Sequence, residues 1–171
     1  MSDFGSATAK ISIKSTNPAA KGGGPTVTAQ YNPKELQIDK NVPWTKANQA
    51  NKSNSKSSQG QGIHLEFTGA EGRTMSVELF FDGFEGNTVN VAKCVQDLET
   101  LASVIRPGST EEDLRRPHQC LVLYGSTVKF LCVIESLSTK YSMFDDKGNP
   151  LRATCTVKLK EADSVSAKKE A

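Results

Sequence analysis

The residues of this chain with the greatest chemical potential are four cysteines and two histidines. The cysteines form no C-x-x-C pair, and neither histidine lies in an H-E-x-x-H motif. Metal sites need such spacings because several ligands must reach one point. Each cysteine instead falls within an apolar run, so we expect reduced thiols in the core and neither a metal site nor a cofactor. These six residues are Cys94, Cys120, Cys132, Cys155, His64 and His118.

The common catalytic motifs are missing from the sequence. It contains no G-x-S-x-G, no Walker sequence and no G-x-G-x-x-G, and the glycines at 22–24 precede no helix that could receive a phosphate. Acidic residues cluster in "STEEDLRR" and "FDD", but both stretches read as turns or caps, with no acid facing a base. We therefore predict that the protein is not an enzyme. An enzyme that uses His64 or His118 is the rival reading.

Charge and hydropathy restrict the partners. The 171 residues suffice for one domain, and 21 basic against 19 acidic residues leave a formal net charge of +2. This balance gives no whole-molecule attraction to nucleic acid or to anionic lipid. No leader-like start and no run of 18 apolar residues occurs. We expect cytoplasmic assembly, with no nucleic acid and no membrane as partner.

Alternation of apolar and polar residues predicts strands in the first half of the chain. Strands are expected at 9–14 and 26–31, and a hairpin is expected between 63–67 and 73–84. Phe80 falls on the polar side of the last of these segments. If it is exposed, an aromatic residue there indicates a contact surface. The alternative is that this segment has a core on both sides.

One segment has helical periodicity. Between residues 88 and 105 apolar side chains recur every three or four positions, Asn90 can cap the start and "RPG" ends the pattern. Burial of these apolar side chains against a sheet, at about 1.5 to 3 kcal/mol each, accounts for the stripe without a ligand. We predict a single helix packed on the sheet.

The pattern of apolar and polar residues in the last third of the chain predicts three or four further strands. The segment 130–134 is apolar throughout, as in a central strand covered on both faces. In the final strand one apolar row faces a row of polar side chains, which either meets water, lines a wet pore or pairs charges across a subunit seam. That polar row is Arg152, Thr154, Thr156, Lys158 and Lys160. Residues 162–171 are expected to form a disordered tail after a domain at 1–161.

The stretch from 44 to 62 is almost entirely Asn, Gln, Ser, Lys and Gly. It has too little apolar surface to offset its ordering entropy, so we predict a long flexible polar loop. It is either a solvated insertion or an arm that lies on an adjacent subunit. In the second case Lys46, Lys52 and Lys56 would meet acidic side chains.

Four stretches in a fixed order carry a family resemblance: "AQYNPKEL", "MSVELFFDGFEG", "LRRPHQCLVLYG" and the segment from "GSTVKF" to "TVKLKE". From about residue 11 to 161 the chain resembles the tube-domain proteins of phage-tail-like contractile injection systems. The matching motif positions are Tyr31, Asn32, Pro33, Glu78, Asp82, Arg116, Pro117, Gly125, Glu135, Ser136, Tyr141, Phe144, Gly148 and Pro150.

This resemblance implies a mainly β (α+β) fold, with a tail-tube-like barrel or sandwich, one packed helix and a long extended loop. It also implies a homohexameric ring that joins the central spike, or hub, to the inner tube or to a second tube initiator, with baseplate or sheath subunits nearby. Similar proteins often add a C-terminal LysM domain, which is not expected here because only about ten residues follow the last predicted strand. The rival is a monomeric small β-barrel that binds nucleic acid or peptide through Tyr141, Phe144 and the 158–160 face.

Overall fold

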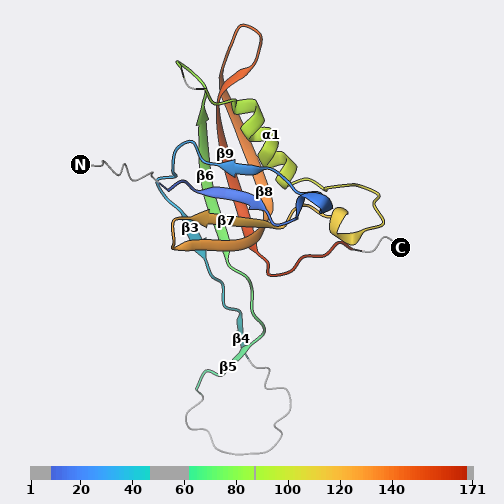
Figure 1. Cartoon of the computed structure of the whole chain (residues 1–171). Helices are drawn as coiled ribbons and strands as arrows, with labels where there is room; N and C mark the ends of the chain where they lie inside the picture. The colour runs from blue at the N-terminus through green and yellow to red at the C-terminus, as the bar shows by residue number, and fades with distance from the viewer. Residues whose placement is uncertain (1–8, 47–61, 87, 169–171) are drawn as a thin grey trace, which may run out of the picture.

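A computed structural model describes residues 9–46, 62–86 and 88–168 of the chain. Seven strands form one antiparallel sheet in the order β2-β1-β7-β8-β9-β6-β3, and β4 pairs with β5 in a separate ribbon (Figure 1). The strands are β1 (Ser12–Ser15), β2 (Thr26–Thr28), β3 (Gln37–Asp39), β4 (Trp44–Lys46), β5 (Leu65–Phe67), β6 (Thr74–Asp82), β7 (Cys120–Tyr124), β8 (Val128–Phe144) and β9 (Pro150–Glu161). The mainly β prediction is confirmed.

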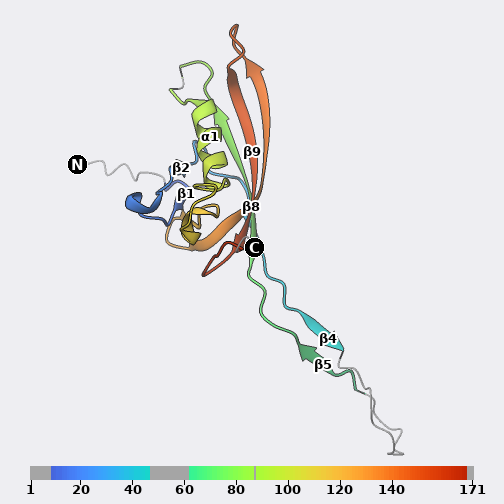
Figure 2. The same ribbon diagram turned by 90° about the vertical axis from the view of Figure 1, so that its right-hand side faces the viewer.

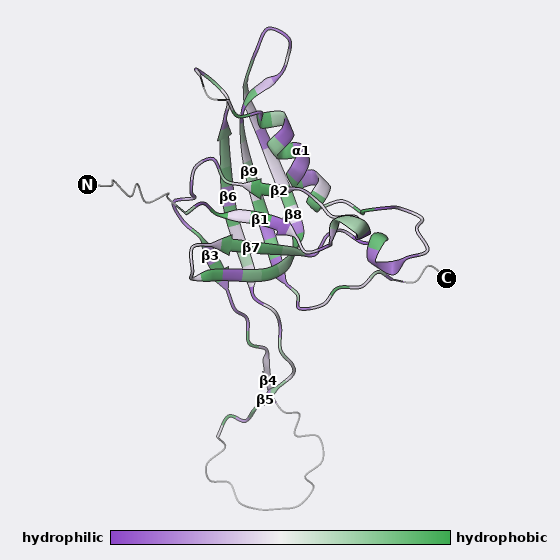
Figure 3. Cartoon of the chain, in the orientation of Figure 1, coloured by the Kyte–Doolittle hydropathy of each residue, from purple (hydrophilic) through white to green (hydrophobic). Residues whose placement is uncertain are grey.

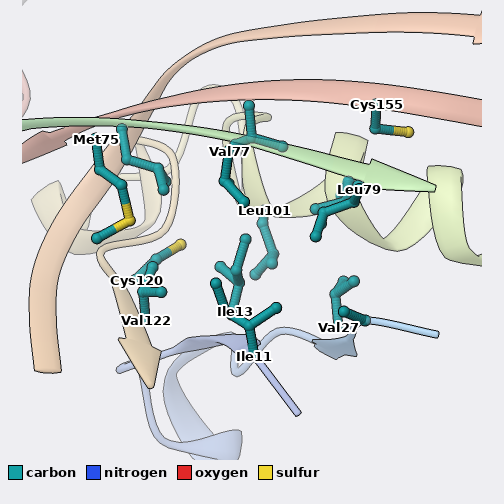
Figure 4. Close-up of a cluster of buried hydrophobic side chains, with 14 of the residues drawn as sticks. Ile11, Ile13, Val27, Met75, Val77, Leu79, Leu101, Cys120, Val122 and Cys155 are labelled. Atoms are coloured by element: carbon teal, nitrogen blue, oxygen red, sulfur yellow. The ribbon is translucent and has the colours of Figure 1, made fainter. Parts of the chain in front are cut away.

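The sheet folds over itself because β8 is much longer than its neighbours. Its first residues, 128–132, pair with β7, and residues 132–144 pair with β9. The β1, β2 and β7 strands therefore lie as a second layer against β6 and β9 (Figure 2). Side chains from both layers meet in the interior, where Ile11, Ile13 and Val122 lie across from Val77 and Leu79 (Figure 4).

One α-helix, α1 (Val91–Leu101), lies beside the β1–β2–β7 layer on the same face of β6, β8 and β9 (Figure 2). Asn90 caps it as predicted, because the Asn90 Oδ1 accepts a hydrogen bond from the Lys93 N–H at 3.1 Å. Both polar and apolar residues occur along the helix (Figure 3). The buried apolar residues recur every three or four positions and form one stripe, which is Val91, Val95, Leu98 and Leu101. Two 3-10 turns, η1 (Ala19–Lys21) and η2 (Glu112–Leu114), lie in the connections.

Four details differ from the sequence expectations. The predicted hairpin between 63–67 and 73–84 is wrong, because β5 pairs with β4 while β6 pairs with β9 and β3. The helix ends at Leu101, before the "RPG" stretch. Residues 44–46 form β4 and are not part of a loop. In 130–134 only Phe130 and Cys132 are buried, so this segment is covered on one face.

The segment after β9 also differs from the disordered tail expected from residue 162. The Ala162 N–H donates to the Leu131 carbonyl at 3.0 Å, and the Gln119 side-chain amide donates to the Ala162 carbonyl at 2.9 Å. Further along, the Ala167 N–H donates to the Glu112 carboxylate at 3.2 Å. These bonds hold the described part of the tail, up to residue 168, against β7, β8 and η2.

Candidate assembly surfaces

Among the described elements, none covers the face of β6, β8 and β9 that points away from α1, and we call it the open face. Side chains alternate between the two faces of β9. The apolar Ala153, Cys155, Val157 and Leu159 point inward and are buried, so the polar residues between them lie on the open face. The register places polar partners from β6 and β8 beside them. The open face carries Ser76, Glu78, Phe80 and Asp82 of β6, Arg152, Thr154, Thr156, Lys158 and Lys160 of β9, and Ser136, Ser138, Lys140 and Ser142 of β8.

Charge on the open face is partly paired. Arg152 Nε lies 3.3 Å from Asp82 Oδ1, and the guanidinium also lies over the Phe84 ring. The hydrogen bond from the Phe84 N–H, together with Arg152, lowers the pKa of the Asp82 carboxyl. In the described part of the chain no ion pair joins Lys140, Lys158 or Lys160 to an acid. The open face therefore has an excess of positive charge and many hydroxyls.

Phe80 lies on this face, as the alternation predicted, and is 38% exposed. Its ring stacks on Tyr31 with the centroids 6.1 Å apart. Together with Pro33 and Glu78 the two rings border a cavity of about 520 Å³ between β6 and the 31–35 loop. The exposed aromatic pair and the adjoining cavity make this part of β6 a candidate contact surface.

A second candidate is the free edge of β8. In an antiparallel sheet, alternate residues direct both backbone groups to the same side. The Gly83 N–H bonds the Leu151 carbonyl, so odd residues of β9 face β6 and even ones face β8. The backbone N–H and C=O groups of Lys140 therefore bond those of its partner Thr154. The backbone N–H and C=O groups of the next residue, Thr139, point away from β9. Because β7 pairs only as far as Cys132, no described strand covers this edge at Leu137, Thr139, Tyr141 and Met143.

The edge of β6 is partly closed. The β3 strand pairs with residues 74–76, and at the other end the Gln30 side chain bonds both backbone groups of Asp82, at 2.7 Å and 2.9 Å. Between these two points the same alternation leaves the backbone groups of Glu78 and Phe80 without a partner among the described strands. Sequence reasoning missed both free edges. The unequal lengths of β7 and β8 are the signal that could have revealed the first.

Several motif positions of the sequence are explained by local structure. The Asn32 side chain bonds the Ile11 N–H at 3.1 Å and the Ala9 carbonyl at 2.7 Å, which ties the 31–33 turn to the start of β1. Glu135 is the extra residue of a β-bulge between Ile134 and Ser136. Gly125 and Gly148 both have positive φ in turns, at 57° and 82°.

The remaining motif positions also have structural contacts. Arg116 donates to the Pro117 carbonyl at 3.0 Å and lies 3.8 Å from Asp113, and Pro117 bridges to Val104. These contacts hold the connection between α1 and β7. Pro150 lies opposite Phe144 where the β8–β9 hairpin begins.

The residues of the rival binding site do not share one face. Tyr141 pairs with the inward-facing Ala153, whereas Lys158 and Lys160 belong to the open face. A single nucleic acid or peptide could not stack on Tyr141 and contact these lysines on one flat surface. Lys46 lies in β4, and Lys52 and Lys56 lie outside the described residues.

Four of the six chemically capable residues, His118, Cys120, Cys132 and Cys155, are buried in the core. Cys94 is only partly buried and His64 is exposed. His118 is buried, with Nδ1 2.7 Å from the Ser15 hydroxyl, and burial lowers its pKa. Burial raises the pKa of both Cys120 and Cys132 to about 12. Within residues 9–46, 62–86 and 88–168, no three His, Cys, Asp or Glu side chains gather as a metal site would require. Across the same ranges, no helix has the length and apolar character needed to cross a bilayer.

A family model described as the contractile injection system tube protein matches residues 7–170, which is almost the whole chain. The chain belongs to this family. Its members are structural tube proteins of injection particles and not a family of enzymes. A tube protein assembles with itself and with other components of the injection system. No match was found among curated proteins.

Proposed function

We propose that this tube protein forms a homohexameric ring that links the central spike, or hub, to the inner tube. The observation that carries the proposal is the free edge of β8, which runs from about residue 134 to 143. An unpaired edge of this length is an aggregation liability in a monomer, and pairing within a closed ring removes it. The tube-protein family supports self-assembly as the means of covering that edge.

In the proposed ring the β8 edge of each copy pairs with the β3–β6 side of the next. The β6 side offers the open backbone groups of Glu78 and Phe80 and the cavity beside Tyr31. With α1 on the outer side, the open face lines the lumen. Its hydroxyls and lysines keep such a lumen wet, because unpaired charged groups retain their water.

The proposed position of the ring, between spike and tube, is supported by the resemblance of the motif positions to tube-domain proteins, which implies a ring that joins these two components. Baseplate or sheath subunits are further proposed neighbours. We place assembly in the cytoplasm, within a particle that is either released or held at a membrane.

Edge pairing can be tested with proline, which removes one backbone donor. Thr139→Pro removes an N–H that points away from β9, so the fold should survive while hexamers disappear in native mass spectrometry. The matched control is Lys140→Pro, which removes an N–H that bonds β9 and should unfold the domain. A folded Thr139→Pro chain that still forms hexamers would refute edge pairing through β8.

The placement between spike and tube has its own test. Purified chain is mixed with the spike and inner-tube proteins of the same particle, and the complexes are imaged by electron microscopy. We expect one ring of six copies bound to both components. Rings that bind neither component would contradict the adaptor role and leave the hexamer intact.

A further inference from the structure

Two exposed apolar surfaces lie at opposite ends of the molecule (Figures 1 and 2). Of their residues, only Met143 also belongs to an edge assigned to ring closure, at the end of β8. One is on the β4–β5 ribbon, which extends from the lower end of the domain. The other is at the tip of the β8–β9 hairpin, beside the turn that follows β6. Isolated apolar side chains are common on surfaces, but grouped ones indicate an interface.

The first surface is one side of the β4–β5 ribbon, here called the ribbon face. Trp44 pairs with Phe67 and Lys46 pairs with Leu65, and the strand period of two places these four side chains on the same side. Trp44 is 55% exposed and Phe67 is 49% exposed, with their rings 5.4 Å apart. Thr45 and Glu66 occupy the other side. The ribbon face is therefore apolar with a single cation.

Within residues 9–46, 62–86 and 88–168, this ribbon has little to stabilise it. It contains three residue pairs, and a two-stranded ribbon is marginally stable in water. None of its residues is buried. A partner that covers Trp44, Leu65 and Phe67 would supply the apolar burial that the monomer lacks.

The second surface, here called the tip patch, takes in the exposed Met143 and Phe144 at the end of β8 and the exposed Phe84 after β6. Arg152, the β9 partner of Ser142, lies over the Phe84 ring and links the two segments. The exposed acids Glu85 and Asp146 adjoin these residues in the sequence. Phe144 is 57% exposed. Asp145 holds the turn rigid by accepting hydrogen bonds from the Lys147 and Asn149 N–H groups at 2.9 Å and 2.8 Å. Lys147 is the one cation in this turn, so acids outnumber bases at the tip.

Met143 adds a second sign that the tip is shaped for contact. Its φ is 56°, in the left-handed region that side chains other than glycine rarely adopt. Such backbone strain is commonly found at ligand or partner contacts. Here it occurs between Ser142 and Phe144, just before the turn.

We propose that the ribbon face of one copy packs on the tip patch of a second copy in the next ring, with Lys46 near Asp146. This inference rests on the proposed ring, and it names the surfaces through which rings stack. The two surfaces match in character, because each is apolar and they carry opposite charges. Because they lie at opposite ends of one chain, their pairing is heterologous and extends along an axis, as a tube requires.

A cross-linking experiment tests the contact directly. In a Cys94→Ser chain, Leu65→Cys and Phe144→Cys place one thiol on the ribbon face and one in the tip patch. We expect oxidation of assembled stacks to give a ladder of linked copies, with about tenfold more product than random encounter gives, because the contact holds the two thiols at high effective concentration. The matched control replaces Leu65→Cys by Glu66→Cys, which lies on the other side of the ribbon.

Equal yields from the Leu65→Cys and Glu66→Cys chains would overturn the inference. Linked dimers without larger products would also overturn it, because they indicate a symmetric contact. Native mass spectrometry of the same samples separates the two proposals. Hexamers without the ladder contradict only the stacking contact, and the absence of hexamers contradicts the ring.

A charge exchange tests the Lys46–Asp146 pairing. Lys46→Glu and Asp146→Lys should each weaken ring–ring association about 60-fold, because a roughly twofold loss at each contact acts at six contacts at once. The double variant should restore stack length in electron micrographs, and all three variants should keep the ring mass. Single variants with normal stacks, or a double variant no better than the singles, would overturn the pairing.

Discussion

The side chain of Gln30 takes the place of a strand beside Asp82. Its Oε1 accepts from the Asp82 N–H at 2.7 Å, and its Nε2 donates to the Asp82 carbonyl at 2.9 Å. Both backbone groups of Asp82 that point away from β9 are thereby satisfied. The amide closes the β6 edge at this point and leaves only the positions around Glu78 and Phe80 open to another strand.

We predict that Gln30→Ala lowers the free energy of unfolding by about 1 to 3 kcal/mol, because two backbone groups lose their partner. The open edge should also let strands pair in a wrong register. Urea denaturation measures the first effect and light scattering the second. Gln37→Ala is the control, since that side chain bonds only the neighbouring exposed Asp39. Equal stability of the two variants would contradict this role of Gln30.

The Arg73–Glu161 pair should make stability depend on pH. Arg73 Nη2 lies 2.6 Å from Glu161 Oε2, and the hydrogen bonds from Arg73 lower the pKa of the Glu161 carboxyl. A lowered folded-state pKa gives stability that is present above the ordinary glutamate pKa and is lost as pH falls through the folded value. Glu161→Gln should therefore be less stable than the unaltered chain at pH 7, and the difference should shrink in acid. A difference that stays constant down to pH 2 would contradict this.

Neighbouring residues in β9 should respond oppositely to the same charge. Val157→Asp places a carboxylate in the core and should prevent folding, because its burial is uncompensated. Lys158→Asp lies on the open face and should change the free energy of unfolding by at most about 0.5 kcal/mol. Circular dichroism and thermal melts compare the two variants. Equal melting temperatures would show that the assignment of faces is wrong.

Charge reversal on the open face should affect function and not folding. Lys158→Glu with Lys160→Glu changes the sign of the proposed lumen, while the monomer keeps its melting temperature. We expect altered ring assembly or altered retention of cargo, measured on purified particles. Thr154→Ser with Thr156→Ser is the uncharged control. Particles indistinguishable from unaltered ones would argue against a lumen or seam role for the lysines.

The thiols should react in a fixed order. Cys120 and Cys132 are fully buried with pKa values raised to about 12, and Cys155 is also buried, so these three should resist thiol reagents at pH 8. Cys94 is only partly buried and should react first. Mass spectrometry after brief labelling counts the modified sites. Rapid labelling of Cys120 in the folded chain would contradict the core assignment.

Local periodicity in the sequence was enough to predict the α1 stripe, its Asn90 cap and the two faces of β9, because each depends on residues a few positions apart. The order of the tube-family motifs likewise indicated the family before any geometry was known. Most of those motif residues prove to serve turns, bulges and strand ends, which local backbone requirements dictate.

Strand partners and free edges were decided by tertiary structure. The alternation of β5 and β6 suits a hairpin between them, yet β5 pairs with β4 and β6 with β9, because pairing depends on which segments the packed core brings together. The Gln30 clamp joins residues 52 positions apart, and no local pattern marks it. The sequence by itself determined which side chains face inward. Long-range packing decided which backbone edges remain available to a neighbouring copy.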